Sequence, residues 1–483
     1  MAQFQPATTE VEILDVLIVG AGISGINCAY RLQTQLLHVK FAILEGRDQI
    51  GGTWDLYRYP GVRNDSHIYS MAFAWHAWPF PNPIATGAQI MEYLSDAVSK
   101  YRLDKYIRFR HKVLSVNWST TGQNWSIVAV NHNGITKKFH ARWIILGTGY
   151  YDYSTPFQTV IPGLENFKGK VVHPQFWPSG FDYTNKKIAI IGSGASAISM
   201  LPALPERATQ VTMVQRSPTY IAPIPNTSWI HHYFPRFLVD ICYLITPYLI
   251  VLLCRHFPDF VRELFRKEAT RLLPKSIDHD THFKPRYNPW EQRICVDPDG
   301  AFFKALRLPN VRLVTGEIHM VTNNEIRMKD GQTVDTDIIV TATGLKMMMG
   351  GKIEIRVDNE PVSWRGRYVW NGAMLDSVPN MMFMFGYANH AWTIGADNTA
   401  IVLTRLWKYM ERNSVRSAIP RVSEDAATGT QRIWQLSSTY VLAVDEELPV
   451  YRMTGNWKPR NRPPVDFLHA RWGNCTSGLE FST

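Results

Sequence analysis

The chain has 483 residues, of which 45% are hydrophobic and 19% charged, which excludes a wholly disordered protein and leaves room for two or three domains. Its formal charge of +10 comes from scattered basic residues rather than a basic run, so we predict no nucleic-acid partner. Five cysteines without a CxxC pair exclude a dithiol reductase and a disulfide framework, which favours a cytoplasmic, reducing compartment; we also predict no bound metal.

The first motif along the chain is a glycine turn between an apolar strand and a helix. In this turn Gly20 makes the bend, Gly22 leaves space for phosphate groups, and Gly25 lets the helix pack closely on the strand. Glu45, at the end of the next strand, is placed to accept hydrogen bonds from an adenosine ribose. The predicted strand, helix and second strand cover residues 15–19, 26–35 and 41–44.

A second glycine pair follows the ribose acid within a few residues, in the sequence GGTW. Gly52 and its neighbours Thr53 and Trp54 expose backbone N–H groups and an aromatic wall where an isoalloxazine ring could lie. The tetrapeptide alone could also be a turn before a buried tryptophan. Together with the preceding turn it favours FAD over NAD at the first nucleotide site.

The middle of the chain is rich in strand patterns. We predict a hairpin around Asn133 and Gly134, with strands at 125–130 and 136–139, and then a separate strand at 142–146. A second strand–helix–strand unit is predicted at 187–191, 197–204 and 210–214, with later strands at 311–314 and 337–341.

The second unit has its own glycine turn, with Gly192, Gly194 and Ser196 as the candidate phosphate-binding residues. The strand after it ends at Arg216 and carries no carboxylate there. An arginine offers a planar set of donors to a 2′-phosphate, which a carboxylate would repel. This predicts NADPH at the second site, the alternative being that Arg216 is a solvated surface residue.

The two glycine turns lie too far apart for one doubly wound domain. The predicted fold class is therefore α/β, with two Rossmann-like dinucleotide-binding domains, one for FAD and one for NADP, and a helical insertion. We predict the FAD domain at 1–155 and 335–483 with the C-terminal tail, the NADP domain at 156–220 and 286–334, and the insertion at 221–285.

The insertion is rich in aromatic residues and prolines and shows no strand pattern. Within it, residues 237–254 are mostly apolar but are interrupted by Asp240 and Pro247. A buried helix is the first interpretation, and a surface helix or lid in contact with a membrane, or a spanning helix, are the alternatives. The protein could therefore be peripheral to a membrane.

An ordered set of five residues joins the two nucleotide units: Phe167, Gly169, His173, Trp177 and Pro178. This set meets the pattern FxGxxxHxxxW followed by Pro or Asp without substitution. With both glycine turns, it makes the chain resemble the type I Baeyer–Villiger monooxygenases, class B flavoprotein monooxygenases, and most closely the ethionamide monooxygenase subgroup. The resemblance extends over most of the chain, from about residue 15 to 410.

The resemblance implies a catalytic pair. The segment GGTWDLYRYPGVRND resembles the family's FAD loop, whose active-site aspartate corresponds to Asp65, also a cofactor-binding candidate. The segment NPWEQRICVD resembles the stretch that holds the catalytic arginine, here Arg293. A structural ion pair is the alternative. For His173 we favour a coupling role in the linker over acid–base chemistry. His390 and Trp392 are further candidates near the flavin, the alternative being that their segment is an ordinary approach to a helix.

The family's chemistry implies that NADPH reduces FAD, that dioxygen forms a C4a-peroxyflavin, and that this inserts oxygen beside a ketone carbonyl to give an ester or lactone. Oxygenation of sulfur or nitrogen, or a non-catalytic flavin-binding redox sensor, are the alternatives. The aromatic insertion favours a bulky, lipophilic substrate, and no obligate protein partner is predicted.

Overall fold

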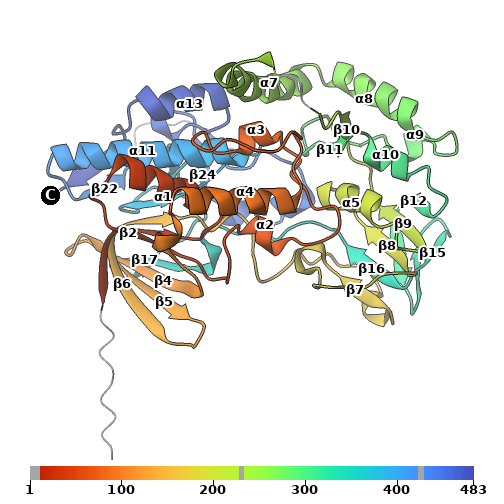
Figure 1. Ribbon diagram of the computed structural model, residues 1–483, viewed down its shortest axis with the longest axis horizontal. Helices are drawn as coiled ribbons and strands as arrows, with labels where there is room; N and C mark the ends of the chain where they lie inside the picture. Colours follow the sequence, from red (N-terminus) through yellow and green to blue (C-terminus); the bar gives the residue numbers. More distant parts are fainter. Residues whose placement is uncertain (1–10, 228–232, 423–428) are drawn as a thin grey trace, which may run out of the picture.

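The computed structural model describes residues 11–227, 233–422 and 429–483. The chain forms two α/β bodies side by side along the long axis, each containing parallel strands (Figure 1). Helices α1 (Ile23–Gln35) and α11 (Trp392–Arg412) pack together over the first sheet, and α5 (Ala195–Met200) lies beside the second (Figure 1). This confirms the predicted fold class of two dinucleotide-binding domains.

The first sheet has β1 (Glu12–Val19) between β2 (Phe41–Leu44) and β6 (Thr136–Leu146), parallel to both. β6 is one strand where two were predicted, because its burial changes from alternating to continuous near residue 143 and mimics a break. Its first half pairs with β5 and its second half with β21. The other strands of this sheet are β3 (Ile107–Arg108), β4 (His111–Ser119), β5 (Asn124–Asn131), β17 (Glu354–Val357), β18 (Glu360–Pro361) and β21 (Met381–Phe383).

The second sheet is fully parallel, in the order β12-β9-β8-β16-β7. Its last strand in sequence, β16, lies beyond residue 334, where the NADP domain was predicted to end, so this sheet extends past the predicted boundary. The boundary was placed too early because β16 pairs with strands some 150 residues earlier. The strands are β7 (Lys170–Val172), β8 (Lys187–Ile191), β9 (Gln210–Gln215), β12 (Val311–Thr315) and β16 (Ile338–Thr341).

One strand lies where only helix was predicted. β10 (Ile221–Ile224) pairs in parallel with β11 (Cys295–Pro298), so the insertion starts later than residue 221. Pro223 hides the strand pattern and is tolerated because the sheet has only two strands. The smaller sheets comprise β13 (Ile318–Val321), β14 (Glu325–Met328) and β15 (Thr333–Asp335); β19 (Val369–Trp370) and β20 (Met374–Leu375); β22 (Ser417–Pro420) and β25 (Leu479–Ser482); and β23 (Thr430–Arg432) and β24 (Val450–Arg452).

The chain passes from the first body to the second after β6 and returns after β16. The two crossing segments pair with each other through an antiparallel bridge between Tyr151 and Met347. The Asp152 N–H donates to the Lys346 carbonyl at 2.7 Å on one side of that bridge. The connection between the bodies is therefore a short two-stranded ribbon.

Apart from the two helices of the insertion, the remaining helices are short, except α4, which starts with a capping box at Thr86 and Gln89. Strand β1 is buried on both faces, which explains its apolar run: Val16 and Ile18 pack in the core under α1, and Leu17 in the opposite core. The helices outside the insertion that have not been given above are α2 (Thr53–Leu56), α3 (Ile68–Met71), α4 (Gly87–Lys100), α9 (His279–His282), α10 (Ala301–Ala305), α12 (Thr439–Leu442) and α13 (Pro463–Trp472).

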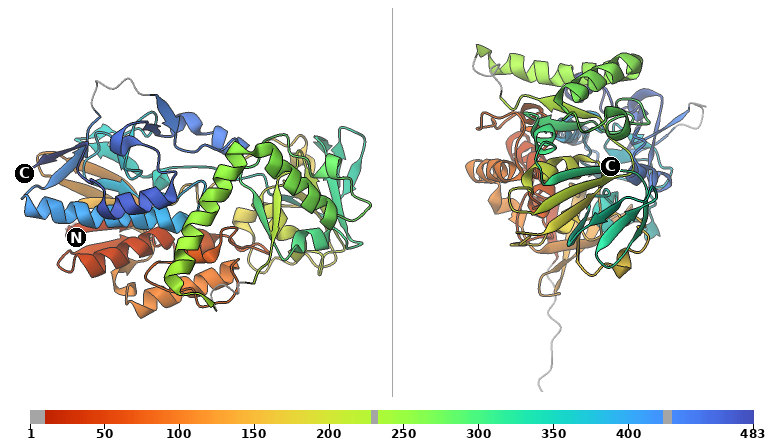
Figure 2. Two further views of the ribbon diagram at one scale, coloured as in Figure 1. Left: turned by 90° about the horizontal axis from the view of Figure 1, so that it is seen from above. Right: turned by 90° about the vertical axis from the view of Figure 1, so that its right-hand side faces the viewer.

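The insertion forms two successive helices, α7 (Arg236–His256) and α8 (Pro258–Leu272), which lie along one outer edge of the molecule (Figure 2). Only 17% of the most apolar 18-residue window of α7 is buried, so the buried-helix interpretation of 237–254 is wrong. The helix has apolar residues on all of its sides, so the periodicity of the sequence alone could not show which side contacts the rest of the protein. Among the described residues, it is the one helix long and apolar enough to cross a membrane.

Candidate active site

A cavity of about 980 Å3 lies between the two bodies. Its walls come from the turns after β8 and β16, the linker before β8, α2, the start of β11 and the insertion helices. The predicted residues that line it are Thr53, Trp54, Asp65, His173, Gly192, Gly194, Ser196, Arg216, Arg293 and His390. The predicted residues outside this lining are Gly20, Gly22, Gly25, Glu45, Gly52, Phe167, Gly169, Trp177 and Pro178.

The first glycine turn contains contacts that only glycine permits. Gly20 has φ of +98°, and a Cβ added there would lie 2.7 Å from the carbonyl oxygen of Gly147. A Cβ on Gly25 would lie 1.9 Å from the Gly20 carbonyl oxygen. The turn therefore packs directly against the end of β6 and against its own helix, as a phosphate-binding turn requires.

Glu45 is buried beside this turn. One carboxylate oxygen accepts from the Ala21 N–H at 2.7 Å and the other from the Arg47 N–H at 2.9 Å. Burial raises the pKa of Glu45, while these two N–H donors act in the opposite direction. Each oxygen keeps a further lone pair, so the carboxylate fits the role of accepting ribose hydroxyls.

The GGTW segment folds back onto the first turn. The Gly51 N–H donates to the Ala21 carbonyl at 3.0 Å, and a Cβ on Gly52 would lie 3.3 Å from the Gly22 Cα. The Tyr151 hydroxyl donates to Thr53 Oγ1 at 2.7 Å. Two glycines that face each other leave a cradle that a side chain would fill, and this arrangement fits the phosphates and flavin of FAD.

The second turn is open toward the cavity. Gly192 has φ of +139°, and a Cβ there would lie 2.2 Å from the Ala342 carbonyl oxygen, whereas a Cβ on Gly194 would meet nothing within 4 Å. Ser193 Oγ donates to the Ser217 carbonyl at 2.8 Å and fixes the turn to the end of β9. The exposed Arg216 follows β9 and lines the same cavity, a position that fits recognition of a 2′-phosphate.

The linker residues mainly support structure. A Cβ on Gly169 would lie 2.2 Å from the Asp337 carbonyl oxygen, and Phe167 packs in the core of the second body. The Trp177 ring makes an edge contact with Phe181, the centroids 5.5 Å apart. Pro178 begins a turn in which its carbonyl accepts from the Phe181 N–H at 3.2 Å.

His173 connects this linker to the turn after β16. Its Nδ1 accepts from the Gln175 N–H at 3.2 Å, so Nε2 carries the proton and donates to the Gly344 carbonyl at 3.3 Å. Burial lowers the pKa of His173. A neutral imidazole that holds two backbone segments together favours the coupling role over acid–base chemistry.

Asp65 lies at the base of the cavity next to Arg63, whose Nε is 3.4 Å from Asp65 Oδ1. Arg63 also donates from Nη2 to the Val296 carbonyl at 2.6 Å, which ties this loop to β11. Burial raises the pKa of Asp65 to about 6, against the opposing effects of Arg63, the backbone N–H of Val296 and the Arg293 charge. Asp65 and Arg293 thus line one cavity and interact electrostatically.

Arg293 extends into the cavity from the segment before β11, and its Nη2 donates to the Tyr387 carbonyl at 3.3 Å. Its positive charge also lowers the pKa of Tyr150, although burial raises that pKa overall. The arginine is exposed to the open cavity. A bound cofactor and substrate would therefore have to exclude water from the cavity, which strengthens the electrostatic interactions of this charge.

Several lining residues were not predicted. Tyr150 stacks on Trp392 with ring centroids 4.9 Å apart, and Tyr440 lies against Gly344, where burial raises its pKa to about 12. These residues come from segments about 290 positions apart, so no local pattern marks them. Arg63 could have been found, since a cation two residues from a candidate carboxylate is itself a signal.

His390 was a candidate and does line the cavity. Its Nδ1 accepts from the Ala391 N–H at 2.8 Å, and its Nε2 then donates to the Leu244 carbonyl of α7 at 3.2 Å. Burial lowers the pKa of His390 to about 4. The imidazole is neutral and fixes α7 to the cavity wall.

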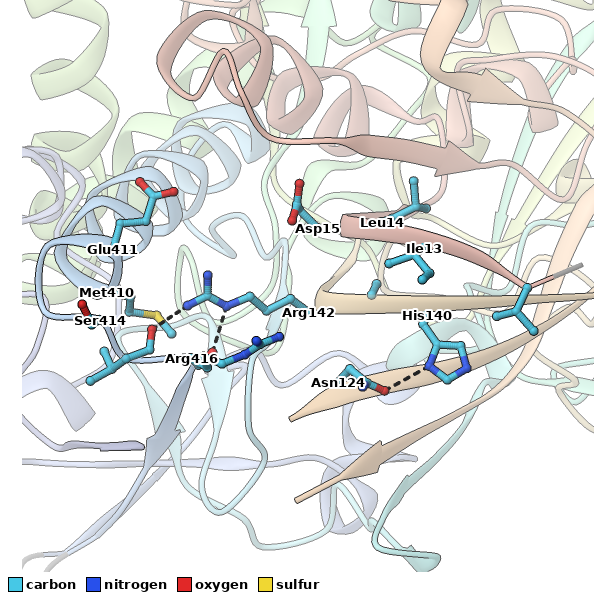
Figure 3. A pocket seen from close by; sticks show the side chains of 13 residues that line it. Ile13, Leu14, Asp15, Asn124, His140, Arg142, Met410, Glu411, Ser414 and Arg416 are labelled. Atoms are coloured by element: carbon cyan, nitrogen blue, oxygen red, sulfur yellow. Dashed lines mark hydrogen bonds between the residues drawn. The ribbon is translucent and has the colours of Figure 1, made fainter. Parts of the chain in front are cut away.

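A second cavity, of about 630 Å3, lies where β1, β5 and β6 meet the end of α11 (Figure 3). Arg142 donates from there to the carbonyls of Val415 and Arg416 and lies over the Trp407 ring, so its donors serve the fold. None of the predicted site residues lines this cavity. Within the described ranges, no group of three or more His, Cys, Asp or Glu side chains could hold a metal ion.

Residues 14–350 match the flavin-binding monooxygenase-like family. The FAD-containing monooxygenase EthA of Mycobacterium tuberculosis is 37% identical over 98% of both chains. A probable FAD-binding monooxygenase, AlmA, of Acinetobacter baylyi is 38% identical over 94% of this chain and 93% of its own.

Two solved structures have the same fold. An oxidized steroid monooxygenase bound to NADP has a TM-score of 0.76 at 21% identity, over 97% of this chain and 99% of its own. A cyclohexanone-bound cyclohexanone monooxygenase also has a TM-score of 0.76, at 20% identity, over 98% and 100% of the two chains.

Proposed function

The chain belongs to the flavin-binding monooxygenase-like family, and from its site we propose that it is an NADPH-dependent Baeyer–Villiger monooxygenase that converts ketones to esters or lactones. The observation that carries this proposal is the position of Arg293, a permanent cation in the cavity that also contains the second glycine turn and Asp65. Oxygen insertion beside a carbonyl builds up negative charge, which such a cation stabilises.

The cofactors are FAD, at Gly20, Gly22, Gly25, Glu45 and the GGTW segment, and NADPH, at Gly192, Gly194, Ser196 and Arg216. When bound, reduced FAD supplies the activation of dioxygen, and NADPH supplies the reducing equivalents. Of the FAD residues, Thr53 and Trp54 line the same cavity as the second glycine turn, and this shared wall supports transfer between the two cofactors.

Asp65 and Arg63 position the cation in this proposal. The ionised Asp65 carboxylate attracts Arg293 and counteracts its tendency to move into solvent, while Arg63 holds the loop on β11.

The substrate proposed is a bulky, lipophilic ketone, since aromatic and aliphatic side chains line much of the cavity: Tyr150, Phe157, Ile250, Phe265, Trp290 and Tyr440.

Product analysis tests this function. The purified FAD-loaded enzyme is incubated with NADPH, oxygen and either a long-chain ketone or a matched thioether, and products are identified by mass spectrometry. We expect the ketone to yield an ester with NADPH consumed in proportion. Sulfoxide formation without any ester would replace the Baeyer–Villiger assignment with sulfur oxygenation, and hydrogen peroxide alone would refute both.

The pH profile tests the role of Asp65. As the pH falls through about 6, the carboxylate gains a proton and becomes neutral, so its attraction for Arg293 is lost. We therefore expect kcat/KM for the ketone to fall about tenfold per unit below that pH. The Asp65→Asn variant should be slower but flat over the same range. Rates measured from about pH 8 to about pH 5 decide this, and an unchanged acid limb in the variant would assign it to another group.

The cellular location proposed is cytoplasmic. All five cysteines are free thiols, and Cys28 and Cys295 are deeply buried, which suits a reducing compartment.

A further inference from the structure

Helix α7 presents an apolar surface to the outside of the molecule. From Leu238 on, most of its exposed apolar side chains follow one another at intervals of three or four positions, and the same surface continues onto α8. We call this set the apolar ridge; it comprises Phe237, Leu238, Ile241, Ile245, Leu249, Leu253, Phe257, Phe260 and Leu264. A contiguous exposed surface of this kind on a folded protein marks an interaction site.

The opposite side of α7 is fixed to the protein. Val239, Val251 and Cys254 are buried, and the Tyr243 ring stacks on His67 with centroids 3.8 Å apart. His390 donates to the Leu244 carbonyl near the middle of the helix. To cross a membrane, the helix would have to break these contacts, so it instead lies flat on the body, along the edge seen in Figure 2.

The helix also reaches the active-site cavity. Pro247 and Ile250 of α7 and Phe265 of α8 line that cavity, while their neighbours Ile245, Leu249 and Leu264 belong to the ridge. One layer of helix therefore separates the cavity from the outer apolar surface.

The charged residues of α7 and α8 indicate what kind of partner binds the apolar ridge. Between residues 237 and 275 there are six Lys or Arg and four Asp or Glu, and all six basic residues follow residue 254. Arg255, Lys267 and Lys275 are exposed beside the ridge. Apolar side chains next to basic ones are the combination by which interfacial helices bind anionic lipid.

We propose that α7 and α8 dock the protein on the surface of an anionic phospholipid bilayer, with the apolar ridge in the acyl boundary and the basic residues at the headgroups. The helix is bound at the interface and does not span. This docking is independent of the proposed activity, because it rests on the exposed residues alone.

Vesicle flotation tests it directly. The FAD-loaded protein is mixed with phosphatidylcholine vesicles that contain roughly one third phosphatidylglycerol, and the fraction that floats is measured. We expect wild type to float, and a triple variant with Ile241→Gln, Ile245→Gln and Leu249→Gln to float roughly tenfold less. None of these three residues lines the cavity, so turnover of a small soluble ketone should be unchanged.

A matched control replaces exposed apolar residues outside α7 and α8, with Leu37→Gln and Ile135→Gln. This control should float like wild type, because only the ridge enters the lipid. Equal flotation of the α7 variant and wild type would overturn the proposal. So would wild type that stays with the soluble fraction and forms a dimer that the α7 variant lacks, since a second copy would then cover the ridge. Equal binding to neutral vesicles would refute the role of the basic residues.

Discussion

Replacing Arg293 with alanine is expected to lower ester formation about 100- to 1,000-fold, the loss typical for removing one charge-stabilising donor from an active site. Its side chain projects into the cavity from the segment before β11 and interacts with the Asp65 charge. NADPH consumption should fall less, because the second glycine turn and Arg216 remain. The measurement is product formed per NADPH consumed, with hydrogen peroxide assayed in parallel.

Arg293→Lys is the matched comparison. It keeps the charge but loses the planar set of donors, including the one to the Tyr387 carbonyl, so it should recover only part of the lost rate. If the alanine variant keeps more than about one tenth of the wild-type ester formation, Arg293 is structural and the charge comes from elsewhere.

Arg216→Ala is expected to raise the KM for NADPH about 10- to 100-fold and to leave the KM for NADH within about twofold. The guanidinium lies at the end of β9, beside the Gly192 turn, where it can pair with a 2′-phosphate that NADH lacks. Initial rates with each coenzyme at saturating substrate measure the change. The quantity to compare between the variant and wild type is the ratio of the specificity for NADPH to that for NADH, rather than the total activity.

Arg312→Ala is the control for this experiment, since Arg312 is an exposed arginine of the same sheet that lies outside the cavity lining. It should leave both KM values unchanged. Equal loss with NADPH and NADH in the Arg216 variant would mean that the arginine supports the turn itself and does not select the coenzyme.

Local chemistry accounts for several of the residues and strands that the sequence predicts around the candidate site. Gly20, Gly25 and Gly192 could be identified from sequence because the close contacts they make leave no room for a Cβ. The strands predicted at 41–44 and 187–191 are β2 and β8, because continuous apolar runs bounded by polar residues mark buried parallel strands. Glu45 followed from its distance to the glycine turn.

Residues that depend on distant pairing could not be predicted. Tyr150 and Tyr440 meet only because both crossing segments return to one cavity, and β10 is a strand only because β11 lies beside it. The exposure of α7 is a further case, since a helix with apolar residues on all sides shows no preferred face until its neighbours are known.

The two-stranded ribbon between the bodies has a mechanical consequence. Its first segment begins at Gly147, whose carbonyl oxygen lies directly against Gly20. Its second segment begins at Ala342, whose carbonyl oxygen lies directly against Gly192. A change in the angle between the bodies must twist both segments together, since Tyr151 and Met347 bridge them. Torsion of the ribbon would therefore displace the backbone that lies against both glycine turns at once.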